Sequence, residues 1–182
     1  MLRRTFIAAC LLAAAATGTA AQEKTAKAIF AGGCFWCVEA DFDKVPGVLA
    51  TTSGYIGGTV KNPTYQQVSG GTTGHAEAVE VVYDPAKVTY AKLLDTFWRN
   101  IDPLAKDKQF CDSGDEYRSA IFYLDDEQKK LAEETKKTVE AKFAPRPVHT
   151  QIVKATEFYK AEDYHQDYLQ RKPNGYTCHY LR

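Results

Sequence analysis

Two cysteines three residues apart, Cys34 and Cys37, follow a Gly-Gly pair and enclose the aromatic residues Phe35 and Trp36. A cysteine sulfur reacts as the thiolate, and exposed N–H groups at the start of a helix stabilise an anion there. We expect a helix to begin at Cys34, so its thiol pKa should fall below the usual value of about 8.5. With an apolar cup beside the sulfur, this stretch predicts attack on a small group that has an apolar arm.

The same stretch allows two plainer interpretations. A Cys-x-x-Cys spacing by itself suggests a thiol–disulfide oxidoreductase, although the bulky Phe-Trp pair would crowd the approach of a disulfide partner. Alternatively, Cys34 is a buried residue at a helix start and the two rings belong to the core. Adjacent residues at a helix start point in different directions, so at least one ring could face outward.

Acidic and phenolic side chains elsewhere could complete such a site. Glu77 stands where a loop becomes an apolar strand, and apolar neighbours raise the pKa of a carboxyl group so that it can donate a proton. Asp112 follows Cys111 and precedes Tyr117, while Tyr65 follows an Asn-Pro-Thr turn. Since the chain has 11 tyrosines, any single one is more usually a packing residue. The four histidines, taken with the cysteines, match no zinc-binding spacing.

Composition bounds the kind of protein. The 182 residues suffice for one core, and the 23 basic and 23 acidic residues balance. This balance argues against nucleic acid and anionic membranes as partners.

The first 21 residues are typical of a secretory signal peptide. Arg3-Arg4 precede an apolar run, 6–16, that is too short to span a membrane, and small residues follow at 19–21. We therefore expect a signal peptide over 1–21, one catalytic domain over 22–182, and an exported protein that is periplasmic or secreted. The twin-arginine and general export routes both remain open.

Four cysteines would remain after cleavage, namely Cys34, Cys37, Cys111 and Cys178. In an oxidising compartment they could form two structural disulfides in any of three pairings, among which the sequence does not choose. A non-catalytic domain held together by two disulfides is therefore a second alternative.

The patterns predict an α+β two-layer sandwich, because strands and helices alternate but several turns between strands are short. We expect strands at 27–31, 48–55, 77–83, 117–124 and 149–154. We expect helices from Cys34, over 65–68, 89–101, 125–143 and 161–171, with a loop at 104–116 and an irregular tail at 176–182.

Six motifs occur along the chain in a fixed order: Gly-Gly-Cys34-Phe35-Trp36, Asn62-Pro63-Thr64-Tyr65, Gly74-His75-Ala76-Glu77-Ala78-Val79, Tyr83-Asp84-Pro85, Tyr117-Arg118-Ser119-Ala120-Ile121 and Ala161-Glu162-Asp163-Tyr164-His165-Gln166. In this combination the chain resembles the class A peptide methionine sulfoxide reductases, from about Ile29 to Cys178. The resemblance implies a ferredoxin-like core with a long irregular C-terminal segment, and reduction of the S epimer of methionine sulfoxide, free or in oxidised proteins.

The resemblance also implies roles for individual residues. Cys34 would attack the sulfoxide sulfur, Phe35 and Trp36 would hold the substrate methyl group, and Glu77 would protonate the sulfoxide oxygen. The residues implied to bind or orient that oxygen are Tyr65, Asp112 and Tyr117. Cys178 would resolve the resulting sulfenic acid.

The family needs no bound cofactor and no metal. An external thiol, a thioredoxin-like protein or dithiothreitol, would reduce the final disulfide. We expect a monomer.

Two cysteines depart from the commonest family pattern. Cys37 stands where glycine is usual, and Cys111 directly precedes Asp112. We hypothesise that Cys37 and Cys111 lie near each other beside the site, either as a structural disulfide or as part of the thiol relay. The resolving residue is then open between Cys178 and Cys37.

Overall fold

A computed structural model describes residues 24–177. The expected signal peptide and the expected resolving residue Cys178 both lie outside this range. None of the helices in the described part is long and apolar enough to cross a membrane.

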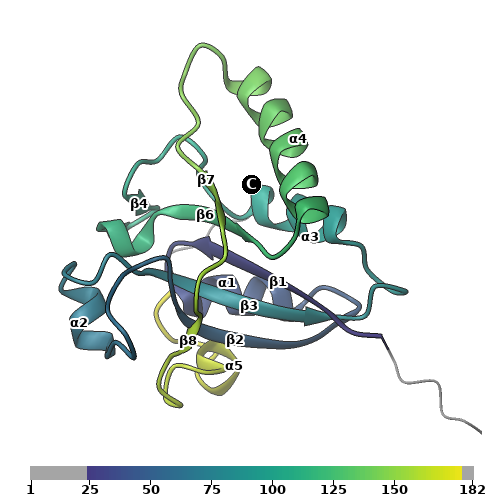
Figure 1. Cartoon of the computed structure of the whole chain (residues 1–182). Coiled ribbons are helices and arrows are strands. Elements are labelled where there is room, and N and C mark those ends of the chain that lie inside the picture. Colours follow the sequence, from purple (N-terminus) through teal and green to yellow (C-terminus); the bar gives the residue numbers. More distant parts are fainter. Residues whose placement is uncertain (1–23, 178–182) are drawn as a thin grey trace, which may run out of the picture.

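Six strands form one sheet in the order β7-β6-β1-β3-β2-β8 (Figure 1). All neighbours pair antiparallel except β6 and β7, which run parallel. The strands are β1 (Ala26–Gly32), β2 (Val48–Ile56), β3 (Ala76–Tyr83), β6 (Ser119–Tyr123), β7 (Gln151–Lys154) and β8 (Tyr159–Lys160).

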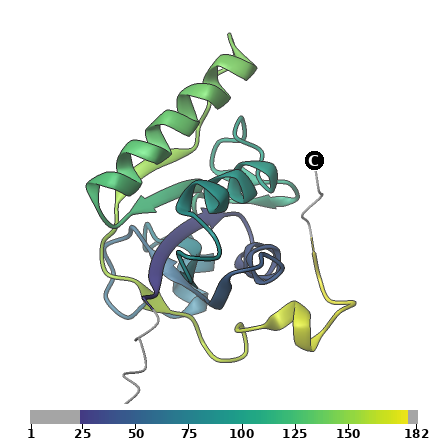
Figure 2. The ribbon, with the colours of Figure 1, turned by 90° about the vertical axis from the view of Figure 1, so that its right-hand side faces the viewer.

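The inner four strands and two helices make the expected ferredoxin-like core. The chain runs β1-α1-β2-β3-α3-β6, and these strands lie side by side in the order β6-β1-β3-β2. Both α1 (Phe35–Asp43) and α3 (Tyr90–Arg99) lie on the same face of the sheet (Figures 1 and 2). The long helix α4 (Asp126–Phe143) packs against the edge formed by β6 and β7 and begins at the capping residue Asp125.

Apolar residues on both faces of β1 explain why this strand sits at the centre. Phe30 points to the helical layer, where its ring lies 4.9 Å from Phe42 and 5.3 Å from Phe97. Ile29 points to the opposite face, in a cluster with Phe122 and the segment that follows β7. A strand buried on both faces reads as a continuous apolar run, as β1 does.

The predicted helix over 161–171 is wrong for most of its length. After β8, the chain instead forms a series of turns over 161–167 and then the single helical turn α5 (Tyr168–Arg171). Asp167 adopts a left-handed conformation with φ of 50°. The Gln166 side chain bonds to both the N–H and the carbonyl of Ser53. Helix propensity does not account for hydrogen bonds such as those of Gln166, which join residues far apart in the sequence.

The loop expected over 104–116 contains a small hairpin of β4 (Lys108–Gln109) and β5 (Asp112–Ser113). Phe110 has φ of 49° in its turn. The buried Gln109 side chain bonds to both the N–H and the carbonyl of Asp102, which fixes the hairpin to the end of α3. A 3-10 turn, η1 (Asp115–Tyr117), follows, so the next strand starts two residues later than expected.

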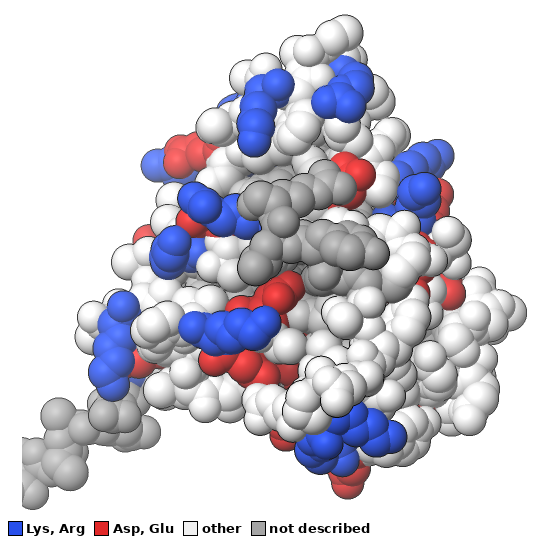
Figure 3. Space-filling model, turned by 180° about the vertical axis from the view of Figure 1, so that it is seen from behind, with Lys and Arg blue, Asp and Glu red and all other residues white. Residues whose placement is uncertain are grey.

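Seen from behind, the surface carries basic and acidic side chains interspersed rather than segregated (Figure 3).

Candidate active site

The turn between β1 and α1 presents the first cysteine of the motif. Gly33 has φ of 94°, which a residue with a side chain rarely adopts, and Cys34 is the N-cap of α1. The Cys34 carbonyl accepts the N–H groups of Cys37 and Val38 at 3.0 and 3.2 Å. Both cysteines are buried, with 6% and 2% of their surface exposed. The helix therefore holds two thiols one turn apart in the interior.

The environment of Cys34 raises its pKa above the ordinary value, so the expected lowering by the helix start is wrong. The main cause is the hydrogen bond with the Cys37 side chain, followed by burial and by repulsion from the Glu77 carboxyl group when it is ionised. A backbone hydrogen bond from Trp36 opposes these effects but is weaker. The raised pKa keeps Cys34 a neutral thiol at neutral pH. Once Cys34 loses its proton, its thiolate is more nucleophilic than the thiolate of a cysteine with a low pKa.

Glu77 is the carboxyl group next to this thiol. Only 2% of its surface is exposed, and its Oε2 accepts the N–H of Phe35 at 3.0 Å. Burial raises its pKa to about 8, and the charges of Asp112 and Glu116 add to the increase, although the Phe35 N–H opposes it. The raised pKa expected from the sequence is present. Glu77 is therefore largely protonated at neutral pH. Its hydrogen bond with the Phe35 N–H attaches it to the residue that follows Cys34.

The two aromatic residues of the motif face different surroundings. Phe35 is 1% exposed and lies against Tyr55 and His165, with ring centroids at 5.9 and 4.9 Å. Trp36 is half-buried and stacks on Tyr168 at 3.8 Å. The sequence allowed that at least one ring could face out of the core, and Trp36 is the ring that the structure leaves partly exposed.

A histidine that the sequence did not single out fixes the tryptophan. The indole N–H of Trp36 donates to Nδ1 of His165 at 3.0 Å, so Nδ1 must be unprotonated. Burial lowers the pKa of His165, which favours the neutral ring. His165 also lies 4.5 Å from the Tyr65 ring. Its motif, 161–166, was recognisable, but the role depends on a contact 129 residues away.

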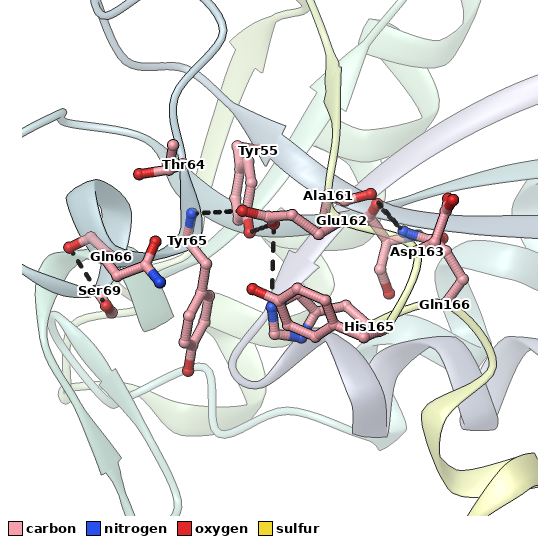
Figure 4. Close-up of polar contacts among 12 residues, drawn as sticks. Tyr55, Thr64, Tyr65, Gln66, Ser69, Ala161, Glu162, Asp163, His165 and Gln166 are labelled. Atoms are coloured by element: carbon pink, nitrogen blue, oxygen red, sulfur yellow. Dashed lines mark hydrogen bonds and ion pairs between the residues drawn. The ribbon is translucent and has the colours of Figure 1, made fainter.

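Glu162 connects this histidine segment to Tyr65 (Figure 4). One carboxylate oxygen accepts the N–H of Tyr65 at 2.9 Å, and the other accepts the hydroxyl of Tyr55 at 2.8 Å. Tyr65 opens the short helix α2 (Tyr65–Ser69), which Thr64 caps through a capping box with Gln67. Burial raises the pKa of Tyr65, and the charge of Glu77 adds to the increase. The Tyr65 phenol therefore lies close enough to Glu77 to interact with it electrostatically.

Tyr117 joins the same cluster from η1. Burial and the charge of Glu77 raise the pKa of Tyr117, so its phenol stays protonated. Arg118 fixes the turn, since it donates to Asp115 and to the carbonyl of Gly74, just ahead of β3. The structure therefore brings Tyr65, Tyr117 and Asp112 into one electrostatic neighbourhood with Glu77.

The chain returns over this cluster before its described part ends. The Tyr176 hydroxyl donates to Asp112 at 2.7 Å, and its ring meets Trp36 edge-on at 6.4 Å. Thr177 places its hydroxyl 3.4 Å from the Cys37 sulfur. Tyr176 and Tyr168 were not predicted as site residues, because their contacts with Asp112 and Trp36 join residues far apart in the sequence.

The cysteines fall into two groups. Cys34 and Cys37 carry thiols, whereas Cys111, at the exposed tip of the β4–β5 hairpin, is disulfide-bonded. Its partner is neither of the two thiols, so the hypothetical Cys37–Cys111 disulfide is not formed. Cys178 lies outside the described residues. Within residues 24–177, no cluster of three or more side chains could hold a metal ion.

Comparison with known proteins agrees with this arrangement. The family model described as Peptide methionine sulfoxide reductase matches residues 26–182. A relative from Ligilactobacillus salivarius, named Peptide methionine sulfoxide reductase MsrA, is 52% identical over 151 residues, which cover 82% of this chain and 88% of the relative.

Solved structures of the same kind superpose on the fold. Mxr1 from Saccharomyces cerevisiae in reduced form is 34% identical with a TM-score of 0.82, covering 87% of this chain and 93% of Mxr1. Methionine sulfoxide reductase A of Corynebacterium diphtheriae is 37% identical with a TM-score of 0.81, covering 86% and 79%. Mxr1 has also been solved in complex with Trx2, at 25% identity, a TM-score of 0.60, and coverage of 92% and 96%. The chain belongs to the peptide methionine sulfoxide reductase family, whose enzymes reduce methionine-S-sulfoxide to methionine with a thiol reductant.

Proposed function

We propose that this enzyme reduces methionine-S-sulfoxide through Cys34 as nucleophile and Glu77 as proton donor. The observation that carries the assignment is a buried thiol next to a buried carboxyl group whose pKa is raised to about 8. A sulfoxide does not readily release oxide, because oxide is too basic a leaving group. A nearby acid removes that obstacle by protonating the oxygen.

The chemical step balances with these two groups. The Cys34 thiolate attacks the sulfoxide sulfur while Glu77 gives its proton to the oxygen. The Glu77 carboxylate takes the proton that the Cys34 thiol loses, and the attack forms a bond between the Cys34 sulfur and the substrate sulfur. The protonated oxygen then moves to the Cys34 sulfur, so that the sulfur–oxygen bond and the new sulfur–sulfur bond of the substrate both break, methionine is released and Cys34 is left as a sulfenic acid. The phenols of Tyr65 and Tyr117, which remain protonated, can hydrogen-bond the oxygen as it gains charge.

Trp36 supplies the apolar contact for the substrate methyl group. Its indole is held by His165 on one edge and by Tyr168 on one face, so its position is set before substrate arrives. Phe35 forms the buried floor beside it. Asp112 adds a carboxyl group to the polar side of the substrate site. In this structure one of its oxygens accepts a hydrogen bond from the Tyr176 hydroxyl.

Regeneration needs a second enzyme thiol and an external reductant. We assign the resolving role to Cys178, with Cys37 as the alternative, since its side chain hydrogen-bonds to Cys34. A thioredoxin-like protein is the reductant that the yeast relative's complex with Trx2 supports. We further propose that the substrates include oxidised proteins, that residues 1–21 direct export to the periplasm or the outside, and that the mature chain acts as a monomer.

Single-turnover assays on the fully reduced enzyme test the assignment. Wild-type enzyme mixed with a methionine-sulfoxide peptide, without reductant, should release methionine, whereas Cys34→Ser should release none. Cys178→Ser should release methionine and retain a sulfenic acid that dimedone traps. No release by wild type would refute the function, and a trapped sulfenic acid in Cys37→Ser instead would move the resolving role to Cys37.

The same assay separates the reaction from simple dithiol exchange by Cys34 and Cys37. An exchange enzyme would lose activity in Cys37→Ser and keep it in Glu77→Gln. The proposed chemistry predicts the reverse order for methionine release.

A further inference from the structure

Glu39 is a buried carboxyl group that the proposed reaction does not use. It lies on α1, the helix that carries Phe35 and Trp36, and only 1% of its surface is exposed. Removing a carboxyl group from water costs free energy unless hydrogen bonds replace the lost water contacts. Its Oε2 accepts the Asp167 N–H at 2.9 Å, a contact between residues 128 positions apart. Glu39 therefore attaches α1 to the chain segment just ahead of α5.

Asp167 has a backbone conformation that needs such a partner. Its φ of 50° lies in the left-handed region, which costs free energy for a residue other than glycine. It is also the N-cap of α5, and its own side chain makes no capping hydrogen bond there. The hydrogen bond to Glu39 offsets part of this cost and sets the direction in which α5 begins.

The segment that Glu39 holds carries both residues that fix Trp36. Tyr168 directly follows Asp167, and its ring stacks on the indole with centroids at 3.8 Å and planes 12° apart. His165, on the other side of Asp167 in the sequence, accepts the indole N–H at 3.0 Å. A shift of the Asp167 backbone would therefore disturb the contact on the face of the indole and the contact on its edge together.

The electrostatic neighbours of Glu39 differ from those of the reaction centre. Burial raises the pKa of Glu39 to about 7, the Asp167 N–H opposes the increase, and the charges of Asp43 and Asp167 add to it. The residues that mainly shift the pKa of Cys34 are instead Cys37, Glu77 and Trp36. Glu39 is thus not placed to pass a proton to the substrate. In either protonation state its carboxyl group keeps an oxygen that can accept the Asp167 N–H.

We propose that Glu39 is a positioning residue that sets the affinity for methionine sulfoxide by holding the backbone of Asp167, and through it the rings that orient Trp36. This inference rests on the proposed function, in which Trp36 contacts the substrate methyl group. Glu39 itself touches neither the substrate nor the reacting sulfur. Its loss should therefore weaken substrate binding and leave the chemical step nearly unchanged.

Single-turnover methionine release, measured without reductant over a range of methionine-sulfoxide peptide concentrations, separates binding from chemistry. Glu39→Leu leaves the Asp167 N–H without an acceptor, so the half-saturating peptide concentration should rise about 5- to 30-fold, with the rate at saturation within about threefold of wild type. Glu39→Gln keeps an acceptor oxygen at the same distance along the side chain and should stay within about twofold of wild type in both quantities. Glu39→Asp keeps the carboxyl group but is one methylene shorter, so it should show an intermediate rise and provides the test if Glu39→Leu does not fold.

Gln170→Ala is the matched control. The Gln170 amide donates to Asp43 at 2.7 Å, an exposed hydrogen bond that also joins α5 to α1. Its loss should change the half-saturating concentration by no more than about twofold, because exposed contacts contribute little. A rise as large as that of Glu39→Leu would overturn the proposal, since docking of α5 as a whole, and not the contact with Asp167, would then set the affinity.

Tryptophan fluorescence reports directly on the ring that Glu39 is proposed to position. The chain has two tryptophans, so Trp98→Phe leaves Trp36 as the only one. In that background, Glu39→Leu should move the emission to longer wavelength and increase quenching by acrylamide, whereas Glu39→Gln should leave both unchanged. An unaltered half-saturating concentration and unaltered emission in Glu39→Leu would overturn the proposal. Absence of methionine release by wild type would instead refute the proposed function itself.

Discussion

The β1–α1 junction and the β4–β5 hairpin differ in how far they bury their cysteine side chains. The junction buries two thiols beside a carboxyl group with a raised pKa, on the central strand of the sheet. The hairpin exposes one cysteine, Cys111, in the turn between two-residue strands that lie outside the ferredoxin-like core. Burial favours the chemical step, because it keeps Glu77 protonated and water away. Exposure favours reduction, because a partner must touch the sulfur.

The two regions also differ in what holds them. At the junction, strand pairing and core packing fix the backbone, so substitutions there should affect stability and chemistry together. At the hairpin, a few side-chain hydrogen bonds fix the position of Cys111, so substitutions of its exposed residues should change the free energy of unfolding little. The following predictions test that division, from the largest expected effect to the smallest.

Phe35→Ala should lower the free energy of unfolding by about 3–5 kcal/mol, since the ring is fully buried in the core. Urea unfolding measures this loss. Tyr176→Phe, which changes an exposed ring of the tail, is the comparison and should shift stability by less than about 0.5 kcal/mol. Similar losses for both would mean that the buried β1–α1 junction contributes no more to stability than the exposed tail.

The ionisation of Glu77 should make stability depend on pH. Its pKa rises from 4.5 to about 8 on folding, so unfolding releases a proton between these values and stability falls as pH rises through that window. The slope from this residue should approach about 1.4 kcal/mol per pH unit near pH 6.

Glu77→Gln should remove that slope while leaving the contribution of Glu39, whose pKa burial also raises, to about 7. Urea unfolding of both proteins at several pH values gives the difference. Parallel stability curves for the two proteins would show that Glu77 is not protonated in the folded state.

His165→Leu should leave the Trp36 indole N–H without its acceptor. The half-buried indole then loses the contact that orients it for the substrate methyl group, so KM for methionine sulfoxide should rise by roughly 5- to 100-fold with kcat less affected. His165→Asn, which keeps an acceptor close to the backbone, should recover part of the loss. If His165→Leu raised KM equally in a Trp36→Phe background, the histidine would not act through Trp36.

Thr64→Ala should remove the side-chain acceptor of the capping box at the start of α2. The expected cost is about 1 kcal/mol in the free energy of unfolding, with a small rise in KM through Tyr65. Thr64→Ser keeps the acceptor and should be neutral. An unchanged stability in Thr64→Ala would mean that Glu162 alone positions the Tyr65 backbone.

Local sequence patterns predicted most of the core elements and the central residues of the site. The apolar run of β1, the amphipathic face of α3 and the capping residues Thr89 and Asp125 all correspond to elements in the structure. Cys34 and Glu77 were recognisable because each stands at the end of a regular element, within a few residues of a turn.

Nonlocal contacts account for what the sequence did not predict. The side chains of Glu162 and Gln166 accept hydrogen bonds from the backbone of Tyr65 and Ser53, about a hundred residues away. These contacts favour turns over the helix that was expected at 161–171. The pKa of Cys34 rises because burial and two neighbouring groups outweigh the helix start. The disulfide at Cys111 depends on which cysteines meet in space, and sequence allowed three pairings.

The central claim is that a buried acid makes the sulfoxide oxygen a leaving group for the Cys34 thiol. Rapid-quench measurement of methionine release in a single turnover tests it most directly, with wild type and Glu77→Gln at pH 7. The account predicts a release rate about 10²–10⁴-fold lower in Glu77→Gln, with substrate affinity little changed. A Glu77→Gln enzyme that releases methionine at the wild-type rate would contradict it.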